Sequence, residues 1–152
     1  MNYLNAIERH HEYKGAIHEL MASIVTGIFD HRSIKSEENL KDSMKWLQSH
    51  YPFVDLVYTL DAKGVQTTNN VTYRHHNENN THSGLGVDRS RRPYYKKALE
   101  EDNVVVTEPY LSTSSHNLCI SSAIRCLADD GSIKAILVVD IDLADAIEFL
   151  MG

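Results

Sequence analysis

Apolar residues recur at helical spacing near the start of the chain. Between residues 3 and 29 they stand at Leu4, Ile7, Ile17, Leu20, Met21, Ile24 and Ile28. This spacing of three and four predicts one long helix, either continuous or broken at Gly15. A second helix is predicted over residues 37–50, because Ser36 supplies an N-cap hydroxyl and Pro52 prevents continuation.

From residue 53 onward the pattern favours strands. Residues 53–60 are rich in Val, Phe and Tyr, residues 65–68 alternate, and the polar stretch between them ends in Gly64, which predicts a β-hairpin. Three further strands are predicted, and short helices are expected on either side of them. The strands are 104–107, 118–127 and 132–141, with a turn at 128–131, and the helices are 94–101 and 143–150.

This order of elements predicts a single α/β (α+β) domain over residues 1–152. Two helices occupy residues 1–50, a five-stranded antiparallel sheet with the binding pocket occupies 53–141, and a C-terminal helix occupies 142–152. A length of 152 residues with 42% hydrophobic residues is enough for one core without metal or disulfide support.

Charge and cysteine content narrow the partners and the compartment. The net charge of −6 disfavours nucleic acid as a partner. The longest apolar run, residues 135–139, is far shorter than the roughly 20 residues of a membrane span, so no membrane segment is predicted and the chain as given is expected to be soluble. Cys119 and Cys126 fall on opposite faces of one predicted strand and cannot pair, which favours a reduced compartment.

The sequence carries no catalytic signature, and we expect a protein that is not an enzyme. It has no nucleophile elbow, no phosphate-binding glycine loop, no paired-cysteine zinc spacing and no HExxH helix. Histidines gather in the polar stretch 69–88, at His75, His76 and His82 beside Glu78, which leaves a haem or metal sensor as an alternative. Metal sites need rigidly held ligands, so we assign no metal site and no cofactor.

Five residues are candidates for binding a small molecule. Arg92 offers a planar guanidinium suited to a carboxylate. Asp140 interrupts an apolar strand and needs a cationic or hydrogen-bonding partner if buried. Tyr94 and Tyr95 are about 100° apart on a helix, so only one can point squarely into a pocket, while Tyr110 follows Pro109 at a strand end.

Neighbouring charged groups have simpler interpretations. Arg89 and Arg91 are interpreted as solvated loop residues. Asp142 is better placed than Asp140 to cap the final helix.

With these residues in view, the chain resembles the Cache or PDC-type sensor domains, a PAS-like family of bacterial chemoreceptors and histidine kinases. The resemblance rests on four segments in family order: YTLDAKGVQ (58–66), DRSRRPYYKKA (88–98), EPYLS (108–112) and VVDIDL (138–143). It implies a PAS-like fold with a long N-terminal helix. It also implies that Arg92, Tyr94, Tyr95, Tyr110 and Asp140 hold the carboxylate and amine of a ligand.

Two positions depart from the family pattern. Tyr94 stands where tryptophan is usual, and Val87 stands where a further tyrosine is expected. The resemblance therefore supports recognition of the carboxylate end of a ligand better than recognition of the amine end.

The leading hypothesis is a sensory domain of bacterial signal transduction that binds a small carboxylate or amino-acid-like metabolite. The alternatives are a ligand-free dimerisation or structural module and the haem or metal sensor. We expect a homodimer through the N-terminal helix, because its apolar stripe is longer than one small sheet should cover. A free-standing chain would be cytoplasmic, whereas one excised from a membrane receptor would face the periplasm.

Overall fold

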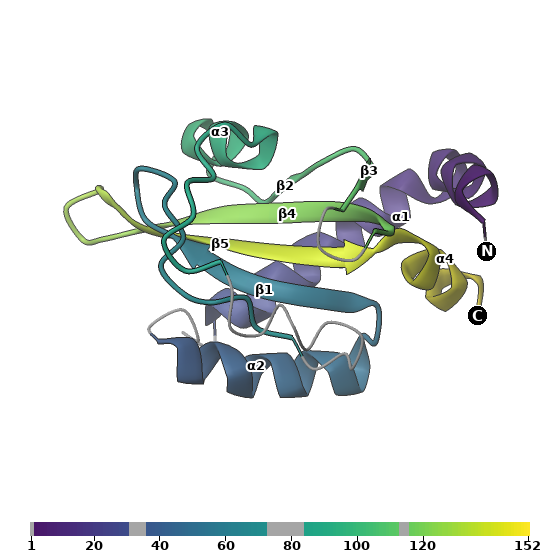
Figure 1. Ribbon diagram of the computed structural model, residues 1–152, viewed down its shortest axis with the longest axis horizontal. Coiled ribbons are helices and arrows are strands. Elements are labelled where there is room, and N and C mark those ends of the chain that lie inside the picture. The colour runs from purple at the N-terminus through teal and green to yellow at the C-terminus, as the bar shows by residue number, and fades with distance from the viewer. Residues whose placement is uncertain (1, 31–35, 73–83, 113–115) are drawn as a thin grey trace.

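The structure, a computed structural model, describes residues 2–30, 36–72, 84–112 and 116–152. Its helices and strands follow one another along the chain as Figure 1 shows. They are α1 (Tyr3–Asp30), α2 (Glu37–His50), β1 (Val54–Leu60), α3 (Pro93–Glu100), β2 (Val105–Val106), β3 (Tyr110–Leu111), β4 (Leu118–Leu127), β5 (Ile133–Asp142) and α4 (Leu143–Met151).

The strands form one five-stranded antiparallel sheet, which confirms the predicted fold class. Its order is β1-β5-β4-β2, and β3 also pairs with β4. The hairpin between β4 and β5 is closed by a turn in which the Gly131 N–H donates to the Ala128 carbonyl at 2.9 Å. Because β5 lies between β1 and β4, its residues are central to the sheet.

The helices begin and end close to their predicted positions. Helix α1 runs through Gly15 without a break. The Ser36 hydroxyl caps α2 by accepting a hydrogen bond from the Asn39 N–H at 3.1 Å. Asp142 caps α4 in the same way, through the Asp145 N–H at 3.0 Å, as the sequence predicted.

The sheet separates two apolar clusters. On one face, Val57, Leu137 and Val139 pack with residues of α1, α2 and α4. On the other face, Tyr58 and Val138 pack with residues of α3. Figure 1 shows α3 and α2 on opposite sides of the sheet. The candidate site lies on the α3 face.

The predicted second arm of the first hairpin is not a regular strand. The turn itself is present, since Gly64 has a φ of +87° and its N–H donates to the Asp61 carbonyl at 3.1 Å. Residues 65–68 then form only isolated bridges, Leu60 with Gln66 and Val65 with Asp88. The Gln66 N–H donates to the Val87 carbonyl, so this segment joins β1 to the segment before α3 instead of extending a ladder. Strand β3 takes its place as the fifth strand.

Much of the apolar stripe on α1 is covered by the domain's own core. Ile17, Ile24 and Ile28 are at most 2% exposed. The reasoning that this stripe is too long for one sheet was therefore wrong over the second half of the helix. Only its start is open, with Leu4 at 73% and Ile7 at 42% exposure.

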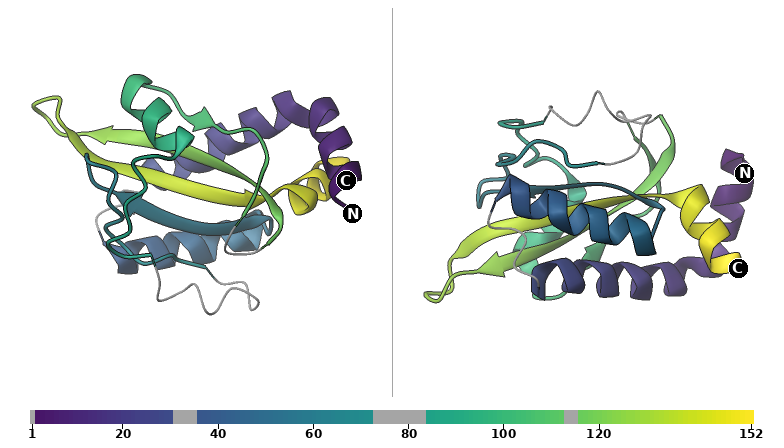
Figure 2. Two further views of the ribbon diagram at one scale, coloured as in Figure 1. Left: turned by 45° about the horizontal axis from the view of Figure 1, so that its top comes forward. Right: turned by 90° about the horizontal axis from the view of Figure 1, so that it is seen from below.

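The two ends of the described chain lie near one another. Figures 1 and 2 show the start of α1 beside the end of α4. Helices long and apolar enough to cross a bilayer are absent from the described part of the chain. Cys119 and Cys126, both on β4, carry free buried thiols, as predicted.

Candidate ligand-binding site

A polar row crosses the middle of the sheet on its α3 face. Asp140 of β5 lies between Leu56 of β1 and Ser121 of β4 in the strand register. The Ser121 hydroxyl is hydrogen-bonded to Asp140 Oδ1 at 2.5 Å and also bonds the Tyr110 hydroxyl. The row therefore links the carboxylate of the central strand to a phenol of β3.

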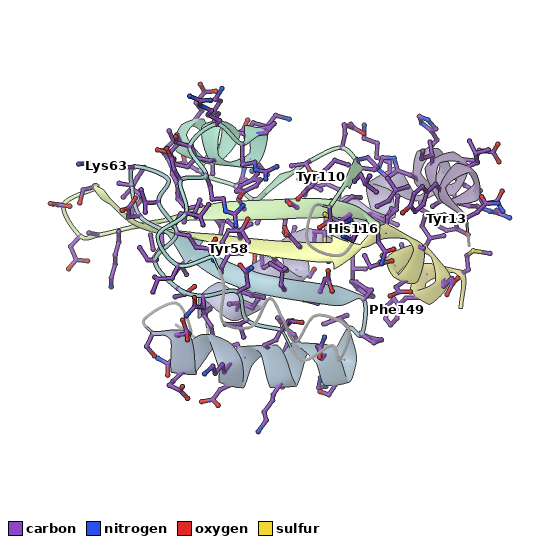
Figure 3. The ribbon with its side chains drawn as sticks, in the orientation of Figure 1. Tyr13, Tyr58, Lys63, Tyr110, His116 and Phe149 are labelled. Carbon is purple, nitrogen blue, oxygen red and sulfur yellow. The ribbon has the colours of Figure 1, made fainter. Side chains whose placement is uncertain are left out.

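This row forms part of the wall of a small polar cavity with a volume of about 30 Å³, room for roughly two waters. Four of the five predicted residues line it together. The described lining residues are Leu56, Tyr58, Asn70, Arg89, Arg92, Tyr94, Tyr110, Ser112 and Asp140. Tyr58 and Tyr110, labelled in Figure 3, enter the site from β1 and β3.

Tyr95 is the predicted residue that does not line the cavity. Its hydroxyl instead donates to the Ala62 carbonyl at 2.7 Å, which ties α3 to the turn after β1. Tyr94, one position earlier, faces the cavity and hydrogen-bonds the Tyr58 hydroxyl at 2.5 Å. The helical angle between the two tyrosines thus separates them as the sequence predicted, with one in the cavity wall and one in a structural contact.

Two guanidinium groups face the cavity. Arg92, the N-cap residue of α3, is half-buried, and neither it nor Arg89 forms an ion pair with a described residue. Interpreting Arg89 as a solvated loop residue was wrong. It is half-buried, its Nε donates to Gln66 Oε1 at 3.2 Å, and its guanidinium carbon lies 5.7 Å from the centre of the Tyr58 ring.

Burial dominates the electrostatics of the site. It raises the pKa of Asp140 from 3.8 to about 7, an effect opposed by the Ser121 hydrogen bond, reinforced by Asp55 and opposed by Arg89 and Arg92. Burial also raises the pKa of Tyr94 to about 12 and raises the pKa values of Tyr58 and Tyr110. The three phenols therefore stay protonated at neutral pH. Because Ser121 donates to Asp140, the Tyr110 hydroxyl donates to Ser121, and one hydroxyl of the Tyr58–Tyr94 pair remains to donate to an anion.

Sequence reasoning missed five residues of the cavity wall: Leu56, Tyr58, Asn70, Arg89 and Ser112. The local pattern places two of them on one face of a strand but does not show that this face borders a cavity. Leu56 and Tyr58 are two residues apart in β1, so their side chains point to the same face of the strand. Arg89 and Arg92 are the ends of a turn in which the Arg92 N–H donates to the Arg89 carbonyl at 3.0 Å, which holds the two arginines close together.

A second hollow adjoins the cavity between α3 and the segment before β3. Its volume is about 430 Å³, and it shares Arg92, Tyr94 and Tyr110 with the cavity. The remaining walls are mostly apolar and are formed by Pro93, Lys97, Thr107, Glu108 and Pro109. A ligand held by the shared residues could therefore extend an apolar part into this hollow.

The sequence left a metal or haem sensor as an alternative, based on the histidines of the stretch 69–88. His75, His76, Glu78 and His82 lie outside the described residues. Among the residues that are described, no three His, Cys, Asp or Glu side chains gather as a metal ion would require.

Comparison with solved structures identifies the fold. The domain resembles the ligand-binding domain of the Campylobacter jejuni chemoreceptor Tlp3 in complex with 4-methylisoleucine, with a TM-score of 0.66 and 18% identity over 93% of this chain and 57% of that one. A Tlp3 sensory domain with isoleucine bound gives 0.65 and 18% identity, over 94% and 60%. The Bacillus subtilis YkuI protein, which has an EAL domain, gives 0.59 and 17% identity, over 87% and 35%.

Comparison of sequences gives one curated relative and a family. The relative, the Citrate (Re)-synthase of Syntrophus aciditrophicus (strain SB), is 26% identical over 132 residues, which are 86% of this chain and 21% of that protein. The chain thus spans about a fifth of that relative and less than two thirds of the solved chains above. Residues 31–148 match the family model described as the methyl-accepting chemotaxis protein-like, first PDC sensor domain. The resemblance to PDC-type sensors is therefore confirmed, and the chain belongs to the family of methyl-accepting chemotaxis protein-like first PDC sensor domains.

Proposed function

We propose that this domain is the ligand-binding part of a signal-transduction receptor and that it binds a small carboxylate or amino-acid-like metabolite. The observation that carries the proposal is the cavity on the α3 face of the sheet. Two half-buried arginines without an ion pair among the described residues face a half-buried carboxylate there. Cationic groups held partly away from bulk water without an ion-pair partner favour an anionic ligand.

The roles of the residues follow from their chemistry. Arg92 binds the ligand carboxylate through its planar fork of N–H donors. Asp140, in its ionised form, accepts from a ligand ammonium group. Tyr94 accepts a hydrogen bond from the Tyr58 hydroxyl and donates its own proton to a ligand oxygen. Tyr110, whose hydroxyl donates to Ser121, forms a wall of the site.

The solved relatives support the amino-acid class. Two of the similar Tlp3 structures hold isoleucine or 4-methylisoleucine. A family of sensor domains also favours a role without catalysis. The activity of the Citrate (Re)-synthase is not proposed for this chain, because only about a fifth of that enzyme is matched.

The test is a thermal-shift screen of the domain against amino acids, short organic acids and amines, followed by calorimetry on each ligand found. Arg92→Ala should weaken carboxylate binding by more than about tenfold, since removing one partner of a desolvated charge pair commonly costs about 2–5 kcal/mol. Arg91→Ala, an exposed arginine of the same segment, is the matched control and should bind like the unchanged domain. Equal affinities in the two variants would contradict the role of Arg92.

Dimerisation is a second candidate function, and one observation favours it. Apolar side chains at the start of α1 and the end of α4 are exposed and lie at the same end of the domain (Figure 2). They are Tyr3, Leu4, Ile7, Phe149 and Met151. We propose a homodimer through this terminal patch, which is compatible with ligand binding on the opposite face of the sheet.

A further inference from the structure

Arg89 is oriented towards the cavity by three contacts. Its backbone N–H donates to the Gly64 carbonyl at 2.8 Å. In its side chain, Nε donates to Gln66 Oε1 at 3.2 Å and the guanidinium lies over the Tyr58 ring. The terminal nitrogens of the guanidinium make no hydrogen bond to a described residue, although the group lines the cavity. The contacts therefore hold the side chain by its inner nitrogen and its flat face, which leaves its outer edge to bind an anion.

Gln66 holds the Arg89 side chain in this orientation through the hydrogen bond between its Oε1 and Arg89 Nε. It is 1% exposed, and its Nε2 donates to the Thr68 carbonyl at 2.8 Å and to Asn70 Oδ1 at 2.9 Å. Because both of these partners are acceptors, the amide nitrogen must point at them, and the amide oxygen is left for Arg89. Gln66 is thus a positioning residue for Arg89 and for Asn70, both of which line the cavity.

The charges around the cavity do not balance with an amino acid that has one carboxylate, because its own ammonium group cancels that carboxylate. Two guanidiniums, Arg89 and Arg92, face one acidic side chain, Asp140. A ligand with one carboxylate would occupy Arg92 and leave Arg89 half-buried without an ion-pair partner among the described residues. A ligand with two acidic groups supplies an anion for each arginine.

Resting on the proposed function, we propose that Arg89 binds a second acidic group, so that the site is specific for small dicarboxylic acids, with or without an amine. The turn that ends at Arg92 keeps the two arginine Cα atoms within about 7 Å, which suits a short diacid. With an amino diacid, the ammonium group meets Asp140. With a diacid that lacks an amine, Asp140 in its protonated form donates to a carboxylate oxygen.

The experiment is calorimetry on the domain with two matched ligand pairs: aspartate against asparagine, and succinate against its monoamide. Within each pair, one carboxylate is replaced by a neutral amide of nearly the same shape. The unchanged domain should prefer the acid of at least one pair by about tenfold or more, as expected for a partly desolvated charge pair. In Arg89→Gln the preference should fall to within about twofold, while the affinity for the amide changes little. The tighter of the two acids shows whether Asp140 meets an ammonium group.

Two variants separate a binding role of Arg89 from a structural one. Arg91→Gln, which removes an exposed charge two residues before α3, should keep the preference for the acid. Gln66→Leu removes the acceptor that orients Arg89 and should reduce the preference for the acid more than it reduces affinity for the amide. A loss of acid and amide affinity by equal factors in Arg89→Gln would mean that Arg89 only supports the cavity wall, and the proposal would be wrong.

Different binding results would refute this inference and the proposed function. If monocarboxylates or neutral amino acids bind but neither acid is preferred over its amide, the second anion site is refuted and the sensor function stands. If no carboxylate or amino acid of the wider screen binds, both are refuted.

Discussion

Asp140 should make the stability of the ligand-free domain fall as the pH rises from about 4 to 7. Burial raises the pKa of this carboxyl from 3.8 to about 7, with Asp55 acting in the same direction and Ser121, Arg89 and Arg92 opposing it. Between these two values the folded domain keeps the Asp140 proton while the unfolded chain has lost it. The free energy of unfolding therefore falls as the pH rises to about 7. Above that pH the contribution of Asp140 to it is constant.

The size of the effect follows from the pKa difference of about three units. At about 1.4 kcal/mol per unit this sets an upper limit of about 4 kcal/mol. The carboxyl borders a cavity that has room for water, which lessens the cost of charging it. We therefore expect the free energy of unfolding to lose about 2–4 kcal/mol through Asp140 between pH 4 and pH 7.

The measurement is urea unfolding of the domain and of Asp140→Asn at half-unit steps from pH 4 to pH 8. The amide of the variant has nearly the same shape and cannot ionise, so the difference between the two unfolding free energies isolates this residue. The free energy of unfolding of the variant should rise relative to that of the unchanged domain as the pH rises to about 7. Above that pH the difference between the two should stay constant. Asp129→Asn, in the exposed turn between β4 and β5, is the control for removing an acidic side chain. A difference that stays flat between pH 4 and pH 7 would show that Asp140 is not a buried acid of raised pKa.

Two further predictions concern the backbone near the site and the assembly of the domain. Gly64→Ala should destabilise the domain by more than about 1 kcal/mol in urea unfolding, because φ is +87° and the new Cβ would approach a neighbouring Cα to 2.9 Å. Gly86→Ala, at φ +85° with open space around it, is the control and should cost less; equal losses would rule out the steric contribution. Light scattering should show a dimer that the double variant Leu4→Ser, Ile7→Ser converts to a monomer, and a monomeric unchanged domain at high micromolar concentration would contradict dimerisation through α1.

The elements that sequence predicted well are those with local signals at both ends. Helix α2 has a capping serine before it and Pro52 after it, and its bounds were predicted to the residue. The 65–68 segment has the alternating side-chain pattern of a strand but does not form a ladder with a neighbouring strand. Its backbone is divided between β1 and the segment before α3, which no local pattern reveals.

The residues of the candidate site also differ in whether local sequence signals point to them. Asp140 could be selected from residue type and neighbours alone, since it interrupts an apolar strand, and Arg92 was selected through the resemblance to PDC-type sensors. Arg89 and Tyr58 could not be selected from neighbours alone, because their positions depend on contacts far apart in the sequence. The Gln66 contact of Arg89 spans 23 residues, and the Tyr94 contact of Tyr58 spans 36. Local patterns give the chemistry of a charged residue but not whether distant segments bring it to a cavity.

Connections of different strength join the candidate site to the terminal helices. Glu108, two residues before Tyr110, forms an ion pair with Lys14 of α1 at 2.6 Å, but both side chains are more than half exposed, so the pair contributes at most about 1 kcal/mol. Strand β5 gives a stiffer connection, because Asp140 in the cavity is only two residues from Asp142, the buried N-cap of α4. Helix α4 in turn shares the apolar cluster of α1. Paired backbone thus runs from Asp140 to α4, and the Ser121 hydroxyl joins Tyr110 to the same carboxylate. We therefore expect a displacement of either residue to reach α4 through β5 and not through the weak surface pair.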